Sequence, residues 1–455
     1  MSSSAIFRRK PARYAAAIEI QALRSTDRSP RGPLEMCRAQ LLRSLDTGDL
    51  LMGTVKRKRT GEVVELVIHG LTASGSAVGR HESGLTLFVG YALPGERVRV
   101  RIRDDKGRYA FADLLEILTT SPERIAPPCP HFGQGRCGGC DWQHIDYSAQ
   151  LHFKQQIVAE QLKRIGHLPD IPVEEVHPSP DQLHYRLHAT FRHQDGHLGF
   201  ISTDDRSPYW IDTCQIIEPA LQAALDDSSL RHAIPPVDRV RLITDGERVS
   251  VHHQPAGTDR VDPSSQAQPA VFPEVLGVRF RVSPGSFFQA NRAQAETLVR
   301  YALEMLRLVP EDRVIDVYCG VGLFTVFAAD VVHRVLGIEQ STAAVRDARY
   351  NTRRFGNVRI LEGDAASRLL DLRDYAASVV IVDPPRAGLA PEVIQAIAAQ
   401  HPQRWLYVSC DPTTFARDAR MIVDRGYQLV RVKPVDMFPQ THHIELIALF
   451  VSETA

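Results

Sequence analysis

The sequence lacks any apolar run long enough to cross a membrane. A membrane-spanning helix needs about 20 consecutive apolar residues, and no stretch of the 455 residues approaches that length. Residues 1–50 also lack a secretory signal, because their apolar side chains are scattered among arginines. These two absences predict a soluble cytoplasmic protein that needs no membrane partner.

Cysteine is scarce, and its count is odd. Seven cysteines, several of them clustered, do not suit a disulfide framework and instead indicate a reducing compartment with metal-binding or catalytic thiols. Net charge is absent as well, since 54 Lys and Arg balance 54 Asp and Glu, so the overall charge identifies no partner. Only the amino-terminal part is mildly basic, with nine Lys or Arg against five Asp or Glu over residues 1–50, which is compatible with nucleic-acid contact.

The length suits about two to four domains, and the sequence pattern divides the chain into four parts. Residues 1–50 are expected to be a disordered basic extension, or an over-long start of the reading frame with Met52 as the real beginning. Residues 51–120 are expected to form a small β-barrel and residues 121–282 a central α+β domain. Residues 283–455 are expected to form an α/β domain.

Short alternating runs of apolar and polar residues fill positions 53–118, separated by Gly and Pro-Gly turns. Period-two patterning with a turn about every ten residues is typical of a small barrel. On one run, four arginines occupy alternate positions from Arg97 to Arg103 and therefore share one face of a strand. Like charges in a row repel each other unless a polyanion neutralises them, so RNA is a natural partner; a solvated outer face is the alternative.

Three thiols lie within twelve residues, at Cys129, Cys137 and Cys140, among glycines that let the backbone fold around a centre. This pattern favours a metal or cluster site. Cys214 is the only unassigned cysteine in the following domain and is the expected fourth ligand. Four thiolates suit either Zn²⁺ or an iron–sulfur cluster, and spacing does not choose between them. It argues against the C-x3-C-x2-C pattern of radical enzymes, because the first gap here is seven residues.

A new pattern, in which strands alternate with helices, begins near residue 314. Val314–Tyr318 is a predicted strand, Cys319–Gly322 a glycine turn, and Glu339 ends the next strand 23 residues beyond Asp316. A glycine turn followed by an acidic residue about 20 positions later is typical of dinucleotide or nucleoside binding, in which the carboxylate accepts hydrogen bonds from the ribose hydroxyls.

The short glycine turn and a closing pair of strands favour a class I S-adenosylmethionine methyltransferase fold over an NAD enzyme. This fold is a Rossmann-like sheet of seven strands in which the seventh runs antiparallel. Asp364 would then lie beside the adenine, and Asp383, which precedes Pro384-Pro385-Arg386, at the methyl-transfer crevice.

Cys410 is the residue on which the predicted chemistry depends. An apolar run ends at this cysteine and Asp411-Pro412 forces a turn, so the thiol is expected at the carboxyl edge of the sheet, facing the ligand crevice. A buried, inert cysteine is the alternative. Carbon 5 of uracil is too weak a nucleophile to attack a methyl sulfonium unaided, but addition of a thiolate to carbon 6 turns the ring into an enolate.

Such chemistry also needs a base that removes the carbon-5 proton before the thiolate is eliminated. Glu445 is the candidate because it is a carboxylate on an otherwise apolar strand, where desolvation raises its proton affinity. The alternative is a strand-end carboxylate paired with a neighbouring basic group. The Asp383-Pro-Pro step also resembles a motif of amino-methyltransferases, but Arg386 replaces the aromatic residue that follows the prolines there.

Five ordered motifs resemble those of the RNA 5-methyluridine methyltransferases: Ser286–Asn291, Val317–Gly322, Asp383–Gly388, Ser409–Pro412 and Thr441–Glu445. The barrel segment resembles the TRAM domain, an OB-like RNA-binding module, and the resemblance covers residues 52–452. It implies that Cys410 is the nucleophile and Glu445 the base. Positions that match cofactor-binding residues of the family are Gln289, Tyr318, Glu339, Asp364 and Asp383.

The resemblance further implies that Cys129, Cys137, Cys140 and Cys214 hold a [4Fe–4S] cluster, which spacing alone could not decide. Two departures from the family pattern stand out. The first gap between cysteines is two residues longer than usual, and Leu323 occupies a position beside the cofactor that is often asparagine.

The expected activity is S-adenosylmethionine-dependent methylation of carbon 5 of a uridine in RNA, on a base flipped out of its stack. Family members that combine a TRAM barrel with the cluster resemble the large-subunit ribosomal RNA enzymes, so ribosomal RNA is the favoured substrate and transfer RNA the alternative. The other hypotheses are a non-catalytic RNA-binding protein, N-methylation of a base, and methylation of DNA. A monomer is expected.

Overall fold

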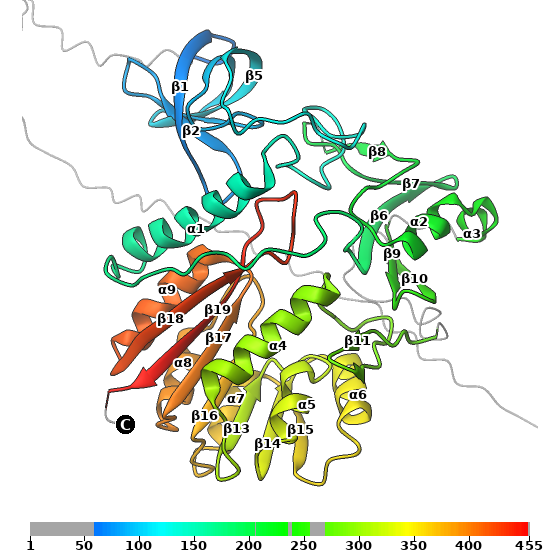
Figure 1. The fold of residues 1–455 in the computed structure, drawn as a ribbon, viewed down its shortest axis with the longest axis vertical. Helices are drawn as coiled ribbons and strands as arrows, with labels where there is room; N and C mark the ends of the chain where they lie inside the picture. The colour runs from blue at the N-terminus through cyan, green and yellow to red at the C-terminus, as the bar shows by residue number, and fades with distance from the viewer. Residues whose placement is uncertain (1–58, 205, 235–238, 255–268, 454–455) are drawn as a thin grey trace, which may run out of the picture. The chain divides into compact units, whose positions relative to one another are not determined.

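The computed structural model describes residues 59–204, 206–234, 239–254 and 269–453, and Figure 1 shows how their helices and strands are arranged. The expected basic extension at residues 1–50 and the alternative start at Met52 lie outside the described residues. All of these described residues belong to one compact unit. Within the described part, none of the helices has the length and apolar character that a bilayer crossing requires.

Residues 63–119 form a closed barrel with the strand order β1-β2-β3-β5-β4. The strands are β1 (Val63–Leu71), β2 (Ala77–Arg80), β3 (Thr86–Val89), β4 (Arg97–Asp105) and β5 (Tyr109–Thr119). In β4 the apolar Val98, Val100 and Ile102 are buried in the barrel core. The intervening arginines therefore lie on the outer face, because successive side chains point to opposite sides of a strand.

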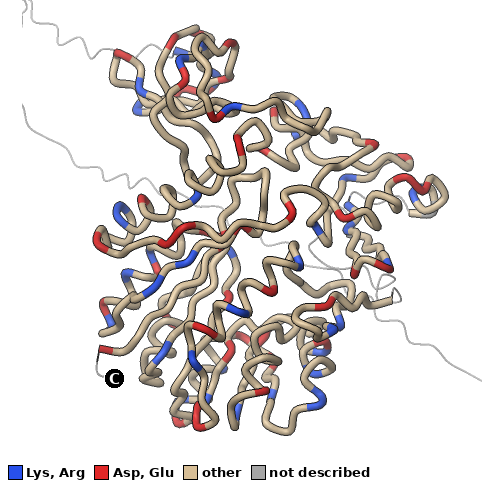
Figure 2. Tube along the Cα trace, viewed as in Figure 1, with Lys and Arg blue, Asp and Glu red and all other residues tan. Residues whose placement is uncertain are grey.

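Acidic residues on neighbouring strands pair with three of the four arginines in this row. Arg97 and Arg99 both pair with Glu65, and Arg103 pairs with Asp113 at 2.9 Å. Figure 2 shows acidic and basic residues interspersed over the barrel. These ion pairs reduce the repulsion within the row, which the sequence pattern alone could not reveal.

An antiparallel sheet with the strand order β10-β9-β6-β7-β8 forms the centre of the next segment. Its strands are β6 (His188–Gln194), β7 (His197–Ile201), β8 (Pro208–Trp210), β9 (Arg239–Thr244) and β10 (Val249–Gln254). Its helices are α2 (Pro219–Asp226) and α3 (Ser228–Ala233). Phe191, Val240 and Leu242 on one face of this sheet pack on Leu221 and Leu225 of α2. The opposite face is polar.

Helix α1 (Tyr147–Arg164) begins at Asp146, whose side chain accepts a hydrogen bond from the Ser148 N–H at 3.0 Å. Its apolar face packs on α9 (Pro412–Val423), and Phe153 shares one core with Phe415 of that helix. A helix from the segment expected to form the central domain is thus built into the core of the carboxyl-terminal α/β domain.

A sheet with the strand order β15-β14-β13-β16-β17-β19-β18 organises the α/β domain, and β19 runs antiparallel to both of its neighbours. The strands are β13 (Arg313–Val317), β14 (Arg334–Glu339), β15 (Val358–Glu362), β16 (Val379–Val382), β17 (Arg404–Ser409), β18 (Tyr427–Val435) and β19 (Glu445–Ser452). A short hairpin, β11 (Glu274–Val275) and β12 (Val278–Arg279), precedes this domain.

Helices cover both faces of the large sheet, which explains its continuous apolar strands. Helices α4 (Arg292–Leu306) and α5 (Leu323–Ala329) pack on one face. Helices α7 (Ala365–Asp371), α8 (Pro391–Ala398) and α9 pack on the other face together with α1. Helix α6 (Thr342–Asn351) lies beside the turn that follows β13. Figure 1 shows this layered arrangement.

Candidate active site and RNA-methyltransferase family

The carboxyl ends of the parallel strands bring five of the predicted site residues to one edge of the large sheet. Tyr318 follows β13, Glu339 ends β14, Asp364 follows β15, Asp383 follows β16 and Cys410 follows β17. In an open α/β sheet, ligands bind in the crevice outside this edge. Residues that are up to 92 positions apart in sequence, from Tyr318 to Cys410, therefore border one crevice.

The glycine turn after β13 fixes the Glu339 carboxylate at this edge. Tyr318, Gly320 and Gly322 adopt positive φ angles of 62°, 55° and 89°, so the turn exposes backbone N–H groups that a regular strand would not. The N–H of Gly320 donates to Oε2 of Glu339 at 3.0 Å, and the N–H of Ser341 donates to Oε1 at 2.7 Å. The carboxylate therefore has a defined orientation before any ligand binds.

Asp316 lies fully buried beneath the turn. Thr325 donates to one of its oxygens at 2.5 Å, while the other oxygen is buried without a hydrogen-bond partner among the described residues. Burial raises the pKa of Asp316 to about 7. Burial, with Asp316 as the second cause, also raises the pKa of Asp383 to about 7. The sequence pattern marked Asp316 only as the start of a spacing, so its coupling to Asp383 was missed.

Two of the predicted cofactor-binding residues, Asp364 and Gln289, lie at the start of a helix or just before one. Asp364 caps α7 by accepting a hydrogen bond from the Ser367 N–H at 3.0 Å, and this bond lowers the pKa of its carboxyl group. Gln289 is buried in the loop before α4. Asn291 caps that helix, and Ser286 of the same loop donates to Asp347 at 2.6 Å. Gln289 is thus held in an ordered loop.

Cys410 and Glu445 face each other across two antiparallel strands. The ladder between β17 and β19 pairs Ser409 with Leu446, and one further step of the same register sets Cys410 opposite Glu445. Opposing residues of an antiparallel pair lie about 5 Å apart and point to the same face. The Glu445 charge is also the second cause, after burial, of the raised pKa of the Cys410 thiol, at about 12.

Arg386 brings a positive charge to these acids. Burial raises the pKa of Glu445 well above its usual range, Asp383 raises it further, and Arg386 opposes both effects. Arg386 likewise lowers the pKa of Cys410, and its Nη2 lies 3.4 Å from Nδ1 of His443. The raised proton affinity of the Glu445 carboxylate suits a proton-transfer group.

Two side chains of α1 hold residues 436–440, the segment that precedes Glu445. Gln440, which has a positive φ of 68°, accepts a hydrogen bond on Oε1 from Gln150 at 3.1 Å and donates its backbone N–H to Gln150 at 3.0 Å. Lys154 and Asp436, both fully buried, form an ion pair at 2.5 Å. These contacts fix a strained backbone that would otherwise relax.

Residues 129–142, which we call the cysteine loop, hold the same segment from another side. The backbone N–H groups of Asp141 and Trp142 both donate to the carbonyl of Gln440, at 3.3 and 3.0 Å. The Asp141 carboxylate accepts the N–H of His442 at 2.9 Å and a second hydrogen bond from its ring Nδ1. Asp141 directly follows Cys140, so the cysteine loop is coupled to the strand that carries Glu445.

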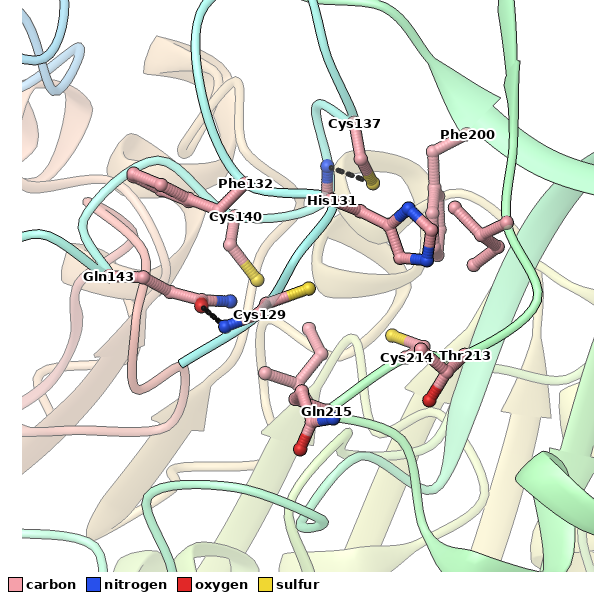
Figure 3. Close-up of a pocket in the computed structure, with 13 residues that line it drawn as sticks. Cys129, His131, Phe132, Cys137, Cys140, Gln143, Phe200, Thr213, Cys214 and Gln215 are labelled. Atoms are coloured by element: carbon pink, nitrogen blue, oxygen red, sulfur yellow. Dashed lines mark hydrogen bonds between the residues drawn. The ribbon is translucent and has the colours of Figure 1, made fainter. Parts of the chain in front are cut away.

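The four predicted metal-binding cysteines line one small cavity. Figure 3 shows their sulfur atoms around this space, Cys129, Cys137 and Cys140 from the cysteine loop and Cys214 from the segment after β8. None of them forms a disulfide. Within the described ranges, no group of three or more Cys, His, Asp or Glu side chains is placed to hold a metal ion. Burial raises the pKa of Cys137 to about 12.

Known proteins resemble this chain over most of its length. It is 35% identical over 444 residues to an uncharacterized RNA methyltransferase of Gloeobacter violaceus, covering 85% of this chain and 96% of the relative. It is 32% identical over 445 residues to another of Halalkalibacterium halodurans, with the same coverage. Residues 275–452 match the tRNA (uracil-5-)-methyltransferase family and residues 57–115 the TRAM domain. The chain belongs to this family of RNA methyltransferases.

The fold of the methyltransferase matches a solved structure over nearly the whole of that protein. The tRNA (uracil-54, C5)-methyltransferase of Pyrococcus abyssi, in complex with S-adenosyl-L-homocysteine, superposes with a TM-score of 0.68 at 24% identity, over 85% of this chain and 99% of that one. The class I methyltransferase fold and the TRAM barrel predicted from the sequence are thereby confirmed.

Several supporting residues of the methyltransferase were missed from the sequence. Gln150 and Lys154 read as ordinary helix residues, and the pairs they form, with Gln440 and Asp436, join positions 290 and 282 apart. Asp141 offered only one signal, its place directly after Cys140. Spacing along the chain cannot reveal contacts that depend on the tertiary fold.

Proposed function

We propose that the protein methylates carbon 5 of a uridine in RNA, with S-adenosylmethionine as the methyl donor, Cys410 as the nucleophile and Glu445 as the base. The observation that carries this proposal is the strand register that sets these two residues opposite each other at the ligand edge of the sheet. A thiol and a carboxylate with raised proton affinity, side by side, suit addition to a ring followed by removal of a proton.

The crevice residues fit the proposed donor. The ordered Glu339 carboxylate suits the ribose hydroxyls, and the positive-φ turn from Tyr318 lets the backbone approach the ligand. Asp364, Asp383 and the loop residue Gln289 complete the proposed set. Bound there, S-adenosylmethionine would supply an electrophilic methyl group on a sulfonium.

The protein's own groups perform the remaining steps. The Cys410 thiol first loses its proton to solvent. The thiolate sulfur then forms a bond to carbon 6 of the uracil, and the electron pair of the 5,6 double bond moves into the enolate, so that carbon 5 becomes the nucleophile. After carbon 5 gains the methyl group, Glu445 takes the proton that this carbon still carries. The electron pair of that C–H bond re-forms the 5,6 double bond, and the thiolate leaves from carbon 6.

Charged groups in the crevice influence the protonation of Cys410 and Glu445. Burial and the neighbouring acids keep Cys410 as a neutral thiol in the free protein, since its pKa is about 12. Arg386 lowers the pKa of both Cys410 and Glu445. It therefore favours the two deprotonated groups that the reaction requires.

The cysteine cavity is proposed to hold a [4Fe–4S] cluster. Four free thiols are a suitable donor set, and thiols whose pKa burial has raised, such as Cys137, need a cation before they become thiolates. A cluster spans several ions, so its ligands do not converge as those of a single ion do. Cys214→Ser should lower the iron content and the visible absorbance of anaerobically purified protein, whereas an unchanged iron content would contradict the assignment.

Large-subunit ribosomal RNA is the proposed substrate, because the barrel is combined with the cysteine cavity. The matching family description and the P. abyssi enzyme refer to transfer RNA, so both RNAs enter the test. Mapping of 5-methyluridine in ribosomal and transfer RNA from a deletion strain should reveal one missing modification in ribosomal RNA. A loss confined to transfer RNA would contradict the choice of substrate.

The mechanism is tested by removal of the thiol. Cys410→Ala should lower the formation of 5-methyluridine by at least about 10³-fold, as loss of a covalent nucleophile does in other enzymes. It should also abolish the gel-stable adduct with RNA that contains 5-fluorouridine. Cys37→Ala is the matched control, because Cys37 lies near the start of the sequence, far along the chain from every proposed site residue, and its replacement should leave the adduct intact. Methylation by Cys410→Ala, or N-methylated bases without 5-methyluridine, would refute the proposal.

A further inference from the structure

The loop between β1 and β2 of the barrel reaches the segment that carries the proposed base. Residues 72–76 form this loop, which we call the barrel loop, and the N–H of Thr72 closes it by donating to the carbonyl of Ser76 at 2.9 Å. Leu71 and Ala73 pack on the hydrophobic core that contains α1 and α9. The barrel loop is therefore anchored in the core of the methyltransferase domain as well as in its own barrel.

Trp142 joins the barrel loop to the segment before Glu445. Its ring N–H donates to the Gly75 carbonyl at 3.2 Å, and its backbone N–H donates to the Gln440 carbonyl at 3.0 Å. The Trp142 side chain is buried, so loss of the bond to Gly75 would leave a buried donor without its partner. One buried residue thus ties the barrel loop to the backbone that leads to Glu445.

Gly75 has no room for a side chain. Its φ of +83° lies in the left-handed region, and a Cβ atom built there would lie 2.8 Å from Oδ2 of Asp141 and from both Cβ and Cγ of His442. The Cβ atom of His442 is next to the backbone and cannot swing away. Asp141 and His442 are also joined by two hydrogen bonds, so one cannot move without the other. Gly75 therefore packs directly against this pair.

The His442 ring leads on to the positive charge beside the two reacting groups. The ring centroids of His442 and His443 are 4.3 Å apart, and Nδ1 of His443 lies 3.4 Å from Nη2 of Arg386. Burial, with His442 as the second cause, lowers the pKa of His443 to about 3, so its neutral ring can accept a hydrogen bond from the guanidinium. Arg386 in turn acts on the charges of Cys410 and Glu445.

We propose that the barrel loop is a positioning element of the active site, with Gly75 and His442 as positioning residues that keep Arg386 beside Cys410 and Glu445. The barrel thereby contributes to turnover, beyond any part that it plays in RNA binding. The inference rests on the proposed function for the roles of Cys410 and Glu445. A chain of contacts supplies a route, and energetic coupling between its ends is the quantity to measure.

Gly75→Ala has a matched control in the same barrel. Gly84, in the turn between β2 and β3, has a φ of +80°, and no atom of the described residues lies within 4 Å of a Cβ built there. Alanine therefore introduces similar backbone strain at both positions, and only Gly75→Ala pushes on Asp141 and His442.

Turnover at saturating RNA and S-adenosylmethionine is the first measurement. Gly75→Ala should lower kcat by about 10- to 100-fold, because displacement by about 1 Å at a reacting group has an effect of this size. Its Kd for RNA and its KM for S-adenosylmethionine should stay at the wild-type values, since Glu339 and the glycine turn lie outside this chain of contacts. Gly84→Ala should leave all three quantities unchanged. A wild-type kcat in folded Gly75→Ala would overturn the inference.

A double-mutant cycle tests the route through His442. His442→Ala removes the ring that contacts His443, so Gly75→Ala should lower kcat little further in that background. Independent, multiplicative effects of the two substitutions would contradict the route. If Gly75→Ala fails to fold, as thermal unfolding would reveal, Trp142→Phe decides. It removes the hydrogen bond to Gly75 without adding an atom and should lower kcat by about 3- to 10-fold, the equivalent of one hydrogen bond.

The outcomes separate this inference from the proposed function. Mass analysis of the product nucleoside tests the reaction, and a methylated base other than 5-methyluridine would refute that reaction while the comparison of kcat values still decides the inference. A readout without turnover is the NMR signal of the His442 ring, assigned by its absence from His442→Ala. This signal should shift in Gly75→Ala and not in Gly84→Ala, and an unshifted signal would overturn the inference whatever the protein methylates.

Discussion

Replacement of Lys154 by methionine should destabilise the protein by about 3–5 kcal/mol, the usual cost of a buried charge left without its partner. Lys154 and Asp436 are both fully buried, with 2.5 Å between Nζ and Oδ1. Nζ also donates to the Phe438 carbonyl at 3.1 Å, and Tyr147 donates to the second Asp436 oxygen at 2.8 Å. Methionine preserves the volume and removes only the charge and its hydrogen bonds, so the Asp436 carboxylate loses its counter-ion in the core.

The double variant Lys154→Met with Asp436→Asn separates the effect of charge from that of packing. Asparagine can still accept the hydrogen bond from Tyr147 but is neutral, so the double variant should regain more than half of the lost stability. Urea unfolding followed by tryptophan fluorescence suits the measurement, because Trp142 and Trp405 are both buried in the core that contains α1. A loss below about 1 kcal/mol, typical of a surface pair, or a double variant no more stable than the single one, would refute the reasoning.

Three further predictions concern the site. Asp141→Asn should lower kcat by about 10- to 100-fold through misplacement of the His442 segment, with the Kd for RNA unchanged, and a normal kcat would contradict the coupling. Burial raises the pKa of Cys410 to about 12, so its thiol is protonated at neutral pH in the free protein, and burial also raises the pKa of Glu445. Since the reaction needs both deprotonated, kcat/KM should rise as the pH increases from about 6 to about 9, and a fall over that range would contradict the assigned roles. Glu339→Gln should weaken S-adenosylmethionine binding by about 10-fold, measured by calorimetry, since hydrogen bonds to a charged acceptor contribute about 1.5–3 kcal/mol; unaltered binding would place the ribose elsewhere.

The features that the sequence predicted well are those encoded locally. Period-two alternation predicted the barrel strands. Glycine or proline turns after apolar runs predicted the strand ends at which Glu339 and Cys410 lie. The position of Glu445 on an apolar strand was also local information. A parallel sheet then brings such residues together, because all its strands end at one edge.

The features that the sequence could not predict depend on which strands and helices become neighbours. Three of the four arginines of β4 have acidic partners on adjacent strands, and a pattern within one strand cannot reveal them. The register between β9 and β6, which sets Arg241 opposite Thr190, was likewise unknown. An arginine row along one strand is compatible with a bare charged face or with ion pairs, and only the cross-strand neighbours decide between them.

The two supports of the segment before Glu445 differ in what could disturb them. The support from α1 is an ion pair and hydrogen bonds inside a packed core, so only unfolding of that core would release it. The support from the cysteine loop depends on Asp141, the residue next to Cys140. A rearrangement of the four cysteines would therefore reach His442, and through it the base, while the glycine turn and Glu339 stayed in place. Loss of the proposed cluster should for this reason lower turnover before it lowers the affinity for the methyl donor.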